Sequence, residues 1–285
     1  MNPDGVLGLV KPPGCSSHDA VALVRKQTGR SAGHLGTLDP LAAGVLVVAY
    51  GRATRLIRYA EGMDKEYNAE VWLGRRSPSE DFGSPLEHGA DASWVTREDV
   101  ERVLSKHLGT RPQRPPAYSA RQVGGQRAYR AARAGEPIDL PARPATLYAW
   151  SVDAFAAGKL AKLRLSLHVG AGFYVRSLAR DLGDEMGTGG VLAALVRTRS
   201  GFLRLDDCQA FEEPWQPQPP GILLSHLPVV ALSDAEARRI VQGQRLPGAG
   251  ALGPHRAECR GRLIGVVVGD EAGVWHPQTV LGMED

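Results

Sequence analysis

The sequence has few of the residues that build disulfide frameworks, metal centres and membrane spans. Its 285 residues include 3 cysteines, Cys15, Cys208 and Cys259, whose spacing forms neither a disulfide framework nor a C-x-x-C zinc motif. The 8 histidines form no H-E-x-x-H or H-x-H pair. The longest apolar runs, such as Gly44–Ala49, are far shorter than the roughly 20 residues that cross a bilayer. We therefore expect no bound metal and no membrane contact.

Several signals of location and catalysis are also missing. Residues 1–10 contain Asp4 and no Lys or Arg, so we expect no secretory signal peptide and a cytoplasmic location. The G-x-x-x-x-G-K-[ST] motif of phosphate-binding loops and the G-x-S-x-G motif of serine hydrolases do not occur. A G-x-G-x-x-G match at Gly248–Gly253 follows a helical pattern rather than a strand, so it does not indicate dinucleotide binding.

Acidic residues are missing from one long stretch of the chain. The net charge is only +3, but Ser105–Ala134 contains no Asp or Glu and includes Tyr118 and Tyr129. The cations of this stretch are Lys106, Arg111, Arg114, Arg121, Arg127, Arg130 and Arg133. Basic residues mixed with aromatics suit a polyanion with bases that can stack, which means a nucleic acid. The same composition also suits a solvated loop, and the charge pattern alone does not separate the two.

The hydrophobic pattern indicates an α+β chain with much antiparallel pairing. The expected strands are Gly5–Lys11, Val45–Ala49, Tyr67–Leu73, Leu147–Phe155, Leu160–Val169, Leu263–Val268 and Val274–Thr279. The expected helices are Ser17–Gln27, capped by Ser16 or Ser17, then Arg52–Ala60, Arg97–Leu108, Tyr174–Met186, Val191–Val196 and Ser233–Gln242. Gly29–Gly44 is expected as a loop. The proline-rich Glu212–Gly221 is expected as a linker or an extended crossing segment before a small β-rich domain that begins at about residue 222.

The segment Gly33–Gly44, here called the Asp39 loop, is unusual for a surface turn. It is apolar apart from His34, Thr37 and Asp39, so we expect it to pack. Its glycines allow a close approach between the backbone and a ligand. Asp before Pro is otherwise a common turn pair, so the residues alone favour a packed turn over a catalytic loop.

Five blocks of the chain, in order, resemble motifs of the bacterial branch of the TruB family of tRNA pseudouridine synthases. The blocks are Lys11–Ser17, the Asp39 loop, Lys65–Tyr67, Arg114–Ala120 and Gly172–Gly183. Apart from the Asp39 loop, they are similar to the family's K-P-x-G-x-x-S, K-x-Y, P-P-x-Y-S-A and G-x-Y-[IV]-R motifs. The resemblance covers about residues 5–205 and implies a pseudouridine-synthase fold, with a mixed, largely antiparallel sheet flanked by helices. It implies a catalytic domain at 1–221, with an RNA-binding insertion, the thumb, at about 112–143. A PUA-like RNA-binding domain is expected at 222–285.

The resemblance also implies a reaction in which the uridine N1–C1′ bond breaks, the base turns, and C5 joins C1′. This isomerisation requires no redox cofactor and no metal. Asp39 matches the family's catalytic aspartate, which acts in ionised form either as a nucleophile or as a base that starts glycosidic cleavage. Arg176 matches the arginine that pairs with it and keeps the carboxylate charged and oriented.

Four further residues match substrate-contacting positions of the family. Tyr67 matches the tyrosine that stacks on the target base, and its phenol is a candidate to help remove the C5 proton. Tyr174 matches a second pocket residue. His34 matches the histidine that enters the T loop after the uridine has been flipped out. Lys11 is expected to support the polar network of the pocket or to contact the RNA backbone. Without the resemblance, the alternative for Tyr67 and Tyr174 is a buried position in the core. The alternative for Lys11 is a surface position at the end of a strand.

The expected partner is tRNA, bound through its T arm without a guide RNA by a monomeric protein. Arg127 and Arg130 of the thumb are expected to contact phosphates. The expected function is isomerisation of a T-loop uridine at position 55. Two alternatives stay open: a tRNA-folding chaperone in which catalysis is secondary, and a synthase that acts on another uridine.

One block departs from the family pattern. After the K-x-Y strand the family has a T-D-T-x-D-like run, whereas Ser77–Gly83 keeps only Asp81 at the acidic position and is one residue shorter. We expect this departure to affect the motion of the Ser77–Gly83 loop more than the chemistry of the isomerisation.

Overall fold

The computed structural model describes residues 4–119, 122–123, 126–136, 138–212, 214–248 and 251–283. The helices of this part of the chain are α1 (Ser17–Thr28), α2 (Ile57–Ala60), α3 (Arg97–His107), α4 (Ala128–Arg133), α5 (Val175–Glu185) and α6 (Asp234–Val241). The large sheet contains β1 (Gly5–Lys11), β2 (Ala32–Leu35), β3 (Ala43–Tyr50), β4 (Lys65–Leu73), β7 (Gly109–Gln113), β10 (Arg143–Ala156), β11 (Ala161–Val169), β12 (Gly190–Ser200) and β13 (Leu203–Arg204). Short pairs are β5 (Arg75–Arg76) with β6 (Glu87–His88) and β8 (Gln122–Val123) with β9 (Gln126–Arg127).

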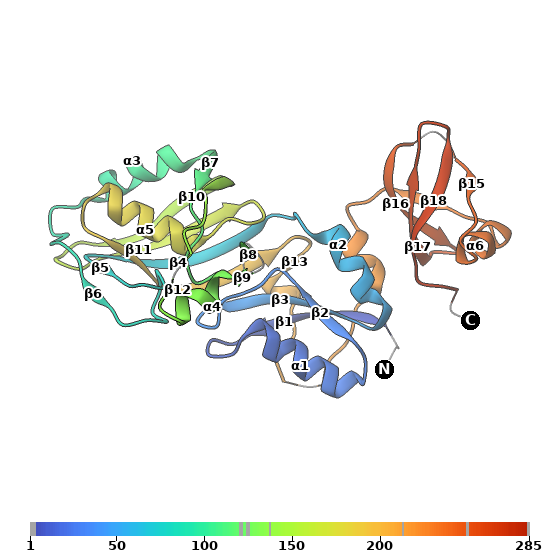
Figure 1. The fold of residues 1–285 in the computed structure, drawn as a ribbon, viewed down its shortest axis with the longest axis horizontal. Coiled ribbons are helices and arrows are strands. Elements are labelled where there is room, and N and C mark those ends of the chain that lie inside the picture. Colours follow the sequence, from blue (N-terminus) through green and yellow to red (C-terminus); the bar gives the residue numbers. More distant parts are fainter. Residues whose placement is uncertain are drawn as a thin grey trace.

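The large sheet has the order β1-β3-β12-β4-β11-β10-β7, and β2 and β13 pair with β3 and β12 (Figure 1). Its neighbours are antiparallel except β12 and β3, which run parallel. Strand β11 alternates as predicted, with Leu163, Leu165 and Leu167 buried and Arg164 exposed. Helix α5 packs on β12 and β4, and α3 packs on β10 and α5. The predicted α+β class is therefore confirmed. One core cluster lies between these helices and one face of the sheet, and a second cluster, which includes Val45 and Val47 of β3, lies on the opposite face.

Two predicted elements are wrong. The expected helix Val191–Val196 belongs to strand β12, which pairs with β4 from Gly190 to Ser200. A short apolar run fits a buried strand or a buried helix, and the pairing with β4 decides between them. The expected loop Gly29–Gly44 contains strand β2, which pairs with β3. His34 therefore lies on a strand, five residues before Asp39, whose carbonyl accepts from the Ala42 amide (3.0 Å) in the turn that follows.

The segment that follows the large sheet crosses it in extended form, the second of the two predicted possibilities. Gln218 exchanges backbone hydrogen bonds with Val6 of β1 (3.0 and 2.8 Å), and Trp215 is buried. Leu223 and Leu224 are buried in a cluster with Val47, so the chain stays packed on the large sheet beyond residue 221.

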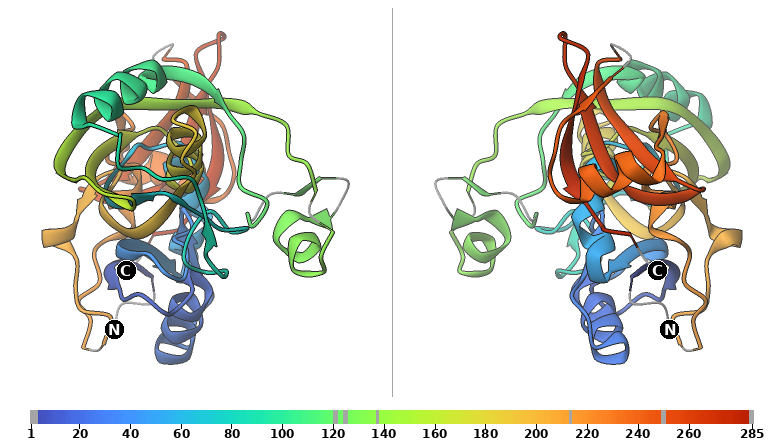
Figure 2. Two further views of the ribbon diagram at one scale, coloured as in Figure 1. Left: turned by 90° about the vertical axis from the view of Figure 1, so that its left-hand side faces the viewer. Right: turned by 90° about the vertical axis from the view of Figure 1, so that its right-hand side faces the viewer.

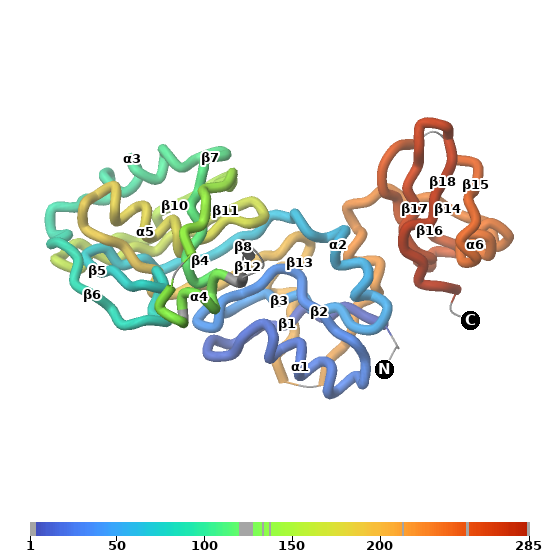
Figure 3. The backbone as a smooth tube through the Cα atoms, viewed as in Figure 1, coloured from blue at the N-terminus to red at the C-terminus, as the bar shows by residue number. Residues whose placement is uncertain are grey.

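A second sheet forms the C-terminal part, at one end of the molecule beside α2 (Figure 3). Its strands, in spatial order, are β14 (Val229–Ala231), β16 (Gly253–Cys259), β17 (Arg262–Gly269), β18 (Val274–Val280) and β15 (Leu246–Pro247). Three arginines spaced three residues apart attach this sheet to the first part of the chain. Arg52 donates to the Leu281 carbonyl, Arg55 to the Val280 carbonyl (2.8 Å), and Arg58 to the Thr279 hydroxyl (2.8 Å).

The thumb connects β7 to β10, whose pairing ends at Gln113 and Arg143. Its described secondary-structure elements are the strands β8 and β9 and the helix α4. Figure 2 shows this segment, in green, projecting from the body of the protein. The thumb is thus an excursion from one edge of the sheet, with its base beside α5.

Candidate active site

Asp39 and Arg176 lie in contact, as the resemblance implied. Arg176 Nη2 donates to Asp39 Oδ1 (3.1 Å), and Arg176 Nε lies 2.9 Å from Oδ2 without the alignment of a hydrogen bond. The Arg176 side chain is 5% exposed and the Asp39 side chain 34% exposed. The guanidinium therefore orients the carboxylate from the protein side, while part of the carboxylate faces solvent, where a substrate can approach.

The backbone on both sides of Asp39 is fixed by buried side chains. The Ser17 hydroxyl donates to the Leu38 carbonyl (2.9 Å) and accepts from the Leu38 amide (2.8 Å). The Lys11 ammonium is fully buried and donates to the Pro40 carbonyl (3.3 Å) and to two carbonyls of the β1–α1 connection. These bonds hold the residues immediately before and after Asp39.

Arg197, a fully buried side chain on β12, holds the start of the Asp39 loop. It donates to the carbonyls of Val45 (2.7 Å), Gly36 (3.1 Å) and Thr37 (3.3 Å). β12 approaches so closely here that a Cβ on Gly44 would lie 2.3 Å from the Arg197 carbonyl oxygen, and Gly44 has φ +104°. Only glycine fits that contact and that backbone conformation. Arg197 and Gly44 together define where the loop leaves the sheet.

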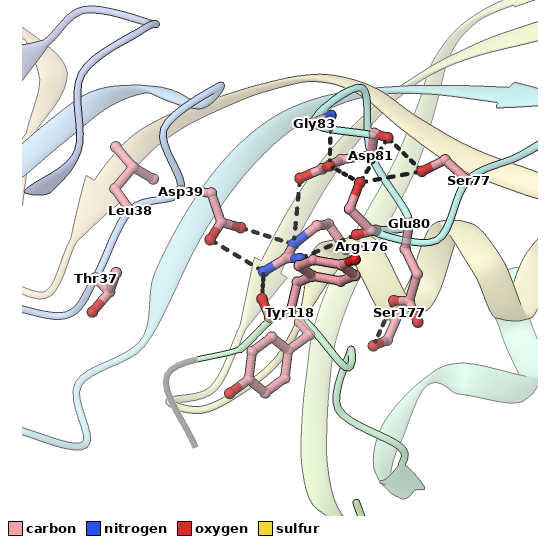
Figure 4. A network of polar contacts seen from close by, with 12 residues as sticks. Thr37, Leu38, Asp39, Ser77, Glu80, Asp81, Gly83, Tyr118, Arg176 and Ser177 are labelled. Atoms are coloured by element: carbon pink, nitrogen blue, oxygen red, sulfur yellow. Dashed lines mark hydrogen bonds and ion pairs between the residues drawn. The ribbon is translucent and has the colours of Figure 1, made fainter. Parts of the chain in front are cut away.

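The atypical segment Ser77–Gly83 supplies a second carboxylate to Arg176 (Figure 4). Asp81 Oδ2 lies 3.7 Å from Arg176 Nε, and the Asp81 carboxylate accepts from the Ser79 hydroxyl (2.6 Å) and the Gly83 amide (2.8 Å). Arg176 Nη1 donates to the Ser79 carbonyl (3.1 Å). Arg176 therefore bridges two aspartates, and the shortened loop still delivers its acid to the site.

The two predicted tyrosines lie on elements that border the site. Tyr67 is 7% exposed on β4, where it pairs in register with Arg197 of β12. Tyr174 directly precedes α5, and its backbone amide and carbonyl bond the side-chain amide of buried Gln113 (2.8 and 3.0 Å). The two hydrogen bonds between the Tyr174 backbone and the Gln113 side chain fix the start of α5 to the end of β7. They thereby fix the backbone position from which the Arg176 side chain extends.

Lys11 and His34 are the two remaining pocket predictions. The Lys11 ammonium donates hydrogen bonds to backbone carbonyls and is shielded from solvent, as expected for a residue that supports the polar network. Burial lowers the pKa of Lys11. His34 is partly buried on β2, and its Nδ1 lacks a hydrogen-bond partner among the described residues. Burial, and then the nearby charges of Arg197 and His18, lower the pKa of His34, which favours the neutral ring.

The basic stretch is spread over several elements. Lys106 on α3 pairs with Glu185 (3.0 Å), and Arg114 at the thumb base pairs with Asp139 (2.5 Å). Arg130 is exposed on α4, where it donates to its neighbour Tyr129 (3.2 Å). Arg127 belongs to β9, and its side chain lies outside the described part of the structure. Acids from outside the stretch therefore pair with two of its cations, which the local composition did not indicate.

The described residues contain neither a metal-ligand cluster nor a membrane-spanning helix. Within them, no three His, Cys, Asp or Glu side chains are grouped to hold a metal ion. In the same part of the chain, no helix is both long and apolar enough to cross a membrane.

Sequence reasoning missed three residues that build the site: Ser17, Gln113 and Arg197. Ser17 ends the Lys11–Ser17 block, so its position was a usable signal. Gln113 and Arg197 act on groups far away in the chain, at sequence distances of 61 and 152 residues. A single sequence contains no local pattern for such contacts.

A sheet-supported loop presents a partly exposed aspartate held by a buried arginine, an arrangement in which a carboxylate can act as nucleophile or base in an enzyme site. Known proteins agree with this class. The TruB family pseudouridylate synthase N-terminal domain matches residues 25–175. A tRNA pseudouridine synthase B of Synechocystis is 43% identical over 252 residues, which is 85% of this chain and 85% of that protein. One of Synechococcus elongatus is 38% identical over 293 residues, 99% of each chain. The chain belongs to the TruB family of pseudouridylate synthases.

Solved structures share the fold. One, described as an H/ACA ribonucleoprotein bound to a substrate RNA containing 2′-deoxyuridine, has a chain with TM-score 0.73 and 23% identity, covering 99% of this chain and 86% of that one. A chain of a Cbf5-Nop10-Gar1 complex has TM-score 0.70 and 25% identity, covering 94% and 79%. The predicted pseudouridine-synthase fold is confirmed.

Proposed function

We propose that this TruB-family enzyme converts the uridine at position 55 in the T loop of tRNA to pseudouridine, acting as a cytoplasmic monomer without a guide RNA. The observation that carries the proposal is the Asp39–Arg176 pair, with Asp39 34% exposed at the centre of a loop fixed on both sides. The relatives named tRNA pseudouridine synthase B support tRNA as the substrate.

The Asp39 carboxylate is the reacting group in this proposal. It either removes the proton that starts cleavage of the N1–C1′ bond, or attacks the substrate and forms a bond that breaks again before the product leaves, which restores the free carboxylate. The base then turns and C5 bonds to C1′, the C5 proton leaves, and N1 gains a proton, so atoms and electrons balance within the isomerisation. Arg176 keeps the carboxylate in place without consuming its exposed face, which serves the near-attack geometry that the step requires.

The other site residues receive supporting roles. Tyr67 stacks on the flipped base from β4, and Tyr174 forms a second wall beside Arg176. The uncharged ring of His34 fills the space that the extruded uridine leaves in the T loop. Lys11 acts through the Pro40 carbonyl on the loop rather than on RNA.

RNA binding is assigned to the parts that flank the site. Arg127 and Arg130 of the thumb contact phosphates near the T loop. Residues 1–221 form the catalytic domain and 222–285 a PUA-like RNA-binding domain, attached through the row Arg52, Arg55 and Arg58.

The test is incubation of the purified protein with unmodified tRNA transcript, followed by mapping of pseudouridine at every position. We expect modification at position 55 alone with no second RNA present. Asp39→Asn should bind tRNA but form no product, and the matched control Asp91→Asn, at an exposed turn, should react like wild type. Modification at another uridine rejects the position, and multiple turnovers by Asp39→Asn reject the site. Tight binding and refolding of tRNA by a wild-type protein that forms no pseudouridine would favour the chaperone alternative.

A further inference from the structure

Glu80 has an unusual setting within the atypical segment Ser77–Gly83. Its backbone is left-handed, with φ +63°, which side chains larger than Asn and Asp seldom adopt. The residues on either side, Ser79 and Asp81, both face Arg176. The Glu80 carboxylate instead reaches Arg180, one turn further along α5, with Oε1 2.5 Å from Nη1. The strained backbone thus lets three consecutive residues contact two arginines of one helix.

The partners of Glu80 hold the base of the thumb. Arg180 Nη2 donates to the Arg114 carbonyl (3.0 Å), and the Ser177 hydroxyl donates to the same oxygen (2.8 Å). Glu80 Oε2 lies 3.3 Å from that hydroxyl. Four residues along the chain, the Tyr118 carbonyl accepts from Arg176 Nη2 (3.1 Å). The segment that leads into the thumb is therefore bonded to α5 by the same network that holds Asp39.

Packing and polar bonds both hold this part of the thumb, where Ser119 and Leu140 are buried. A pocket of about 440 Å³ lies at the junction and is lined by the thumb residues Ala117, Ile138 and Leu140 and by Glu80, Arg180 and Asp181. The Glu80 side chain is 12% exposed at its edge, and burial raises the pKa of its carboxyl, so the pairing with Arg180 is what favours the charged form. The polar bonds from Arg180 and Ser177 to the Arg114 carbonyl therefore add to packing in attaching the thumb base to the helix.

We propose that Glu80 is a positioning residue that, through Arg180 and Ser177, latches the base of the thumb to α5 and so couples the thumb to the Asp39–Arg176 pair. The charged carboxylate orients the Arg180 fork toward the Arg114 carbonyl. With the latch closed, Tyr118 stays within reach of Arg176. With the latch open, the contact between the Tyr118 carbonyl and the Arg176 guanidinium is lost. RNA bound to the thumb then no longer influences the position of the Asp39 carboxylate through Arg176.

The consequence for catalysis rests on the proposed function. Loss of the latch should lower the single-turnover rate at saturating tRNA by about 3- to 10-fold, which lies in the lower part of the range for residues coupled in one network, and change tRNA affinity less. A purely structural role would instead lower the thermal midpoint and leave the rate of the folded enzyme unchanged.

The experiment compares Glu80→Gln, Arg180→Met and the double variant with wild type. Amide hydrogen exchange in the free protein is measured for peptides that cover residues 114–119 and 128–136. Both single variants should exchange faster there, and the double variant no faster than either, because each opens the same latch. Glu185→Gln is the matched control, since that carboxylate pairs from the same helix with Lys106 of α3. It should leave exchange in the thumb unchanged.

Glu80→Gly separates charge from backbone strain. It relieves the positive φ and removes the carboxylate, so we expect an unchanged or raised thermal midpoint together with a loosened thumb. Unchanged thumb exchange in folded Glu80→Gln, or effects of the two single variants that multiply in the double variant, would overturn the proposal. Exchange needs no substrate, so a wild-type protein that forms no pseudouridine would refute the proposed function while leaving the latch testable.

Discussion

Removal of the Arg197 guanidinium should both disorganise the Asp39 loop and destabilise the protein. In Arg197→Met, a side chain of comparable length fills the space but leaves the carbonyls of Val45, Gly36 and Thr37 without their donors. The Val45 carbonyl is buried, whereas Gly36 and Thr37 are exposed residues whose carbonyls water can reach.

The magnitude follows from this difference. A buried carbonyl that loses its partner costs about 1–3 kcal/mol, and each of the other two bonds contributes about 1 kcal/mol. Removal of a buried charge offsets part of the loss. We expect the free energy of unfolding to fall by about 2–4 kcal/mol. The single-turnover rate should fall at least about tenfold, which corresponds to only about 1.4 kcal/mol of misplacement at the reacting carboxylate.

Denaturant titration gives the free energy of unfolding. Rapid-mixing assays on tRNA, at a temperature well below the thermal midpoint, give the single-turnover rate. Arg199→Met is the matched control: this side chain lies two residues further on β12 and pairs with Asp64 (2.7 Å) and Glu66 (2.8 Å), not with the loop. It should lose stability without a comparable loss of rate. A folded Arg197→Met enzyme that reacts as fast as wild type would refute the reasoning.

Three further predictions concern other parts of the site. Arg176→Lys keeps a charge but loses the fork that contacts Asp39, Ser79 and Tyr118, so the single-turnover rate should fall by at least about tenfold with little change in tRNA affinity; equal rates would show that the fork is dispensable. Burial, reinforced by the Arg197 charge, lowers the pKa of Lys65 from 10.5 to about 8. Between those pH values the unfolded chain binds more protons than the folded one, so this group makes the free energy of unfolding rise with pH by up to roughly 3 kcal/mol. Lys65→Met should remove that rise in denaturant titrations across the range, and an identical pH dependence in both proteins would contradict it. Finally, Arg127→Ala with Arg130→Ala should weaken tRNA binding and flatten log affinity against log salt by about 0.7–0.9 per lost phosphate contact. Unchanged affinity and slope in binding titrations would favour a solvated loop.

Local features of this fold could be predicted because their causes lie within a few residues. The Thr96–Asp99 capping box begins α3 as expected, and Ser16 with Asp19 does the same for α1. The alternation along β11 follows from burial of one face. These elements need no knowledge of distant partners.

Elements whose state depends on distant chain could not be predicted. Val191–Val196 has a pattern suited to either helix or strand, and β4, more than a hundred residues earlier, makes it a strand. The Asp39–Arg176 contact joins residues 137 positions apart, and only the family resemblance suggested it. No local sequence pattern identifies Arg197, because its role is to donate hydrogen bonds to three backbone carbonyls that only the folded chain brings close to it.

The bonds around Asp39 limit how far its motif can be transplanted. The loop takes its shape from an ammonium on β1, a hydroxyl on α1 and a guanidinium on β12, not from its own twelve residues alone. A graft of Gly33–Gly44 into a foreign sheet would carry the nucleophile and its glycines but none of these three anchors. The active site therefore consists of the loop together with its three anchors. A sequence search that scores the loop alone will accept proteins that have the aspartate but lack the side chains that orient it.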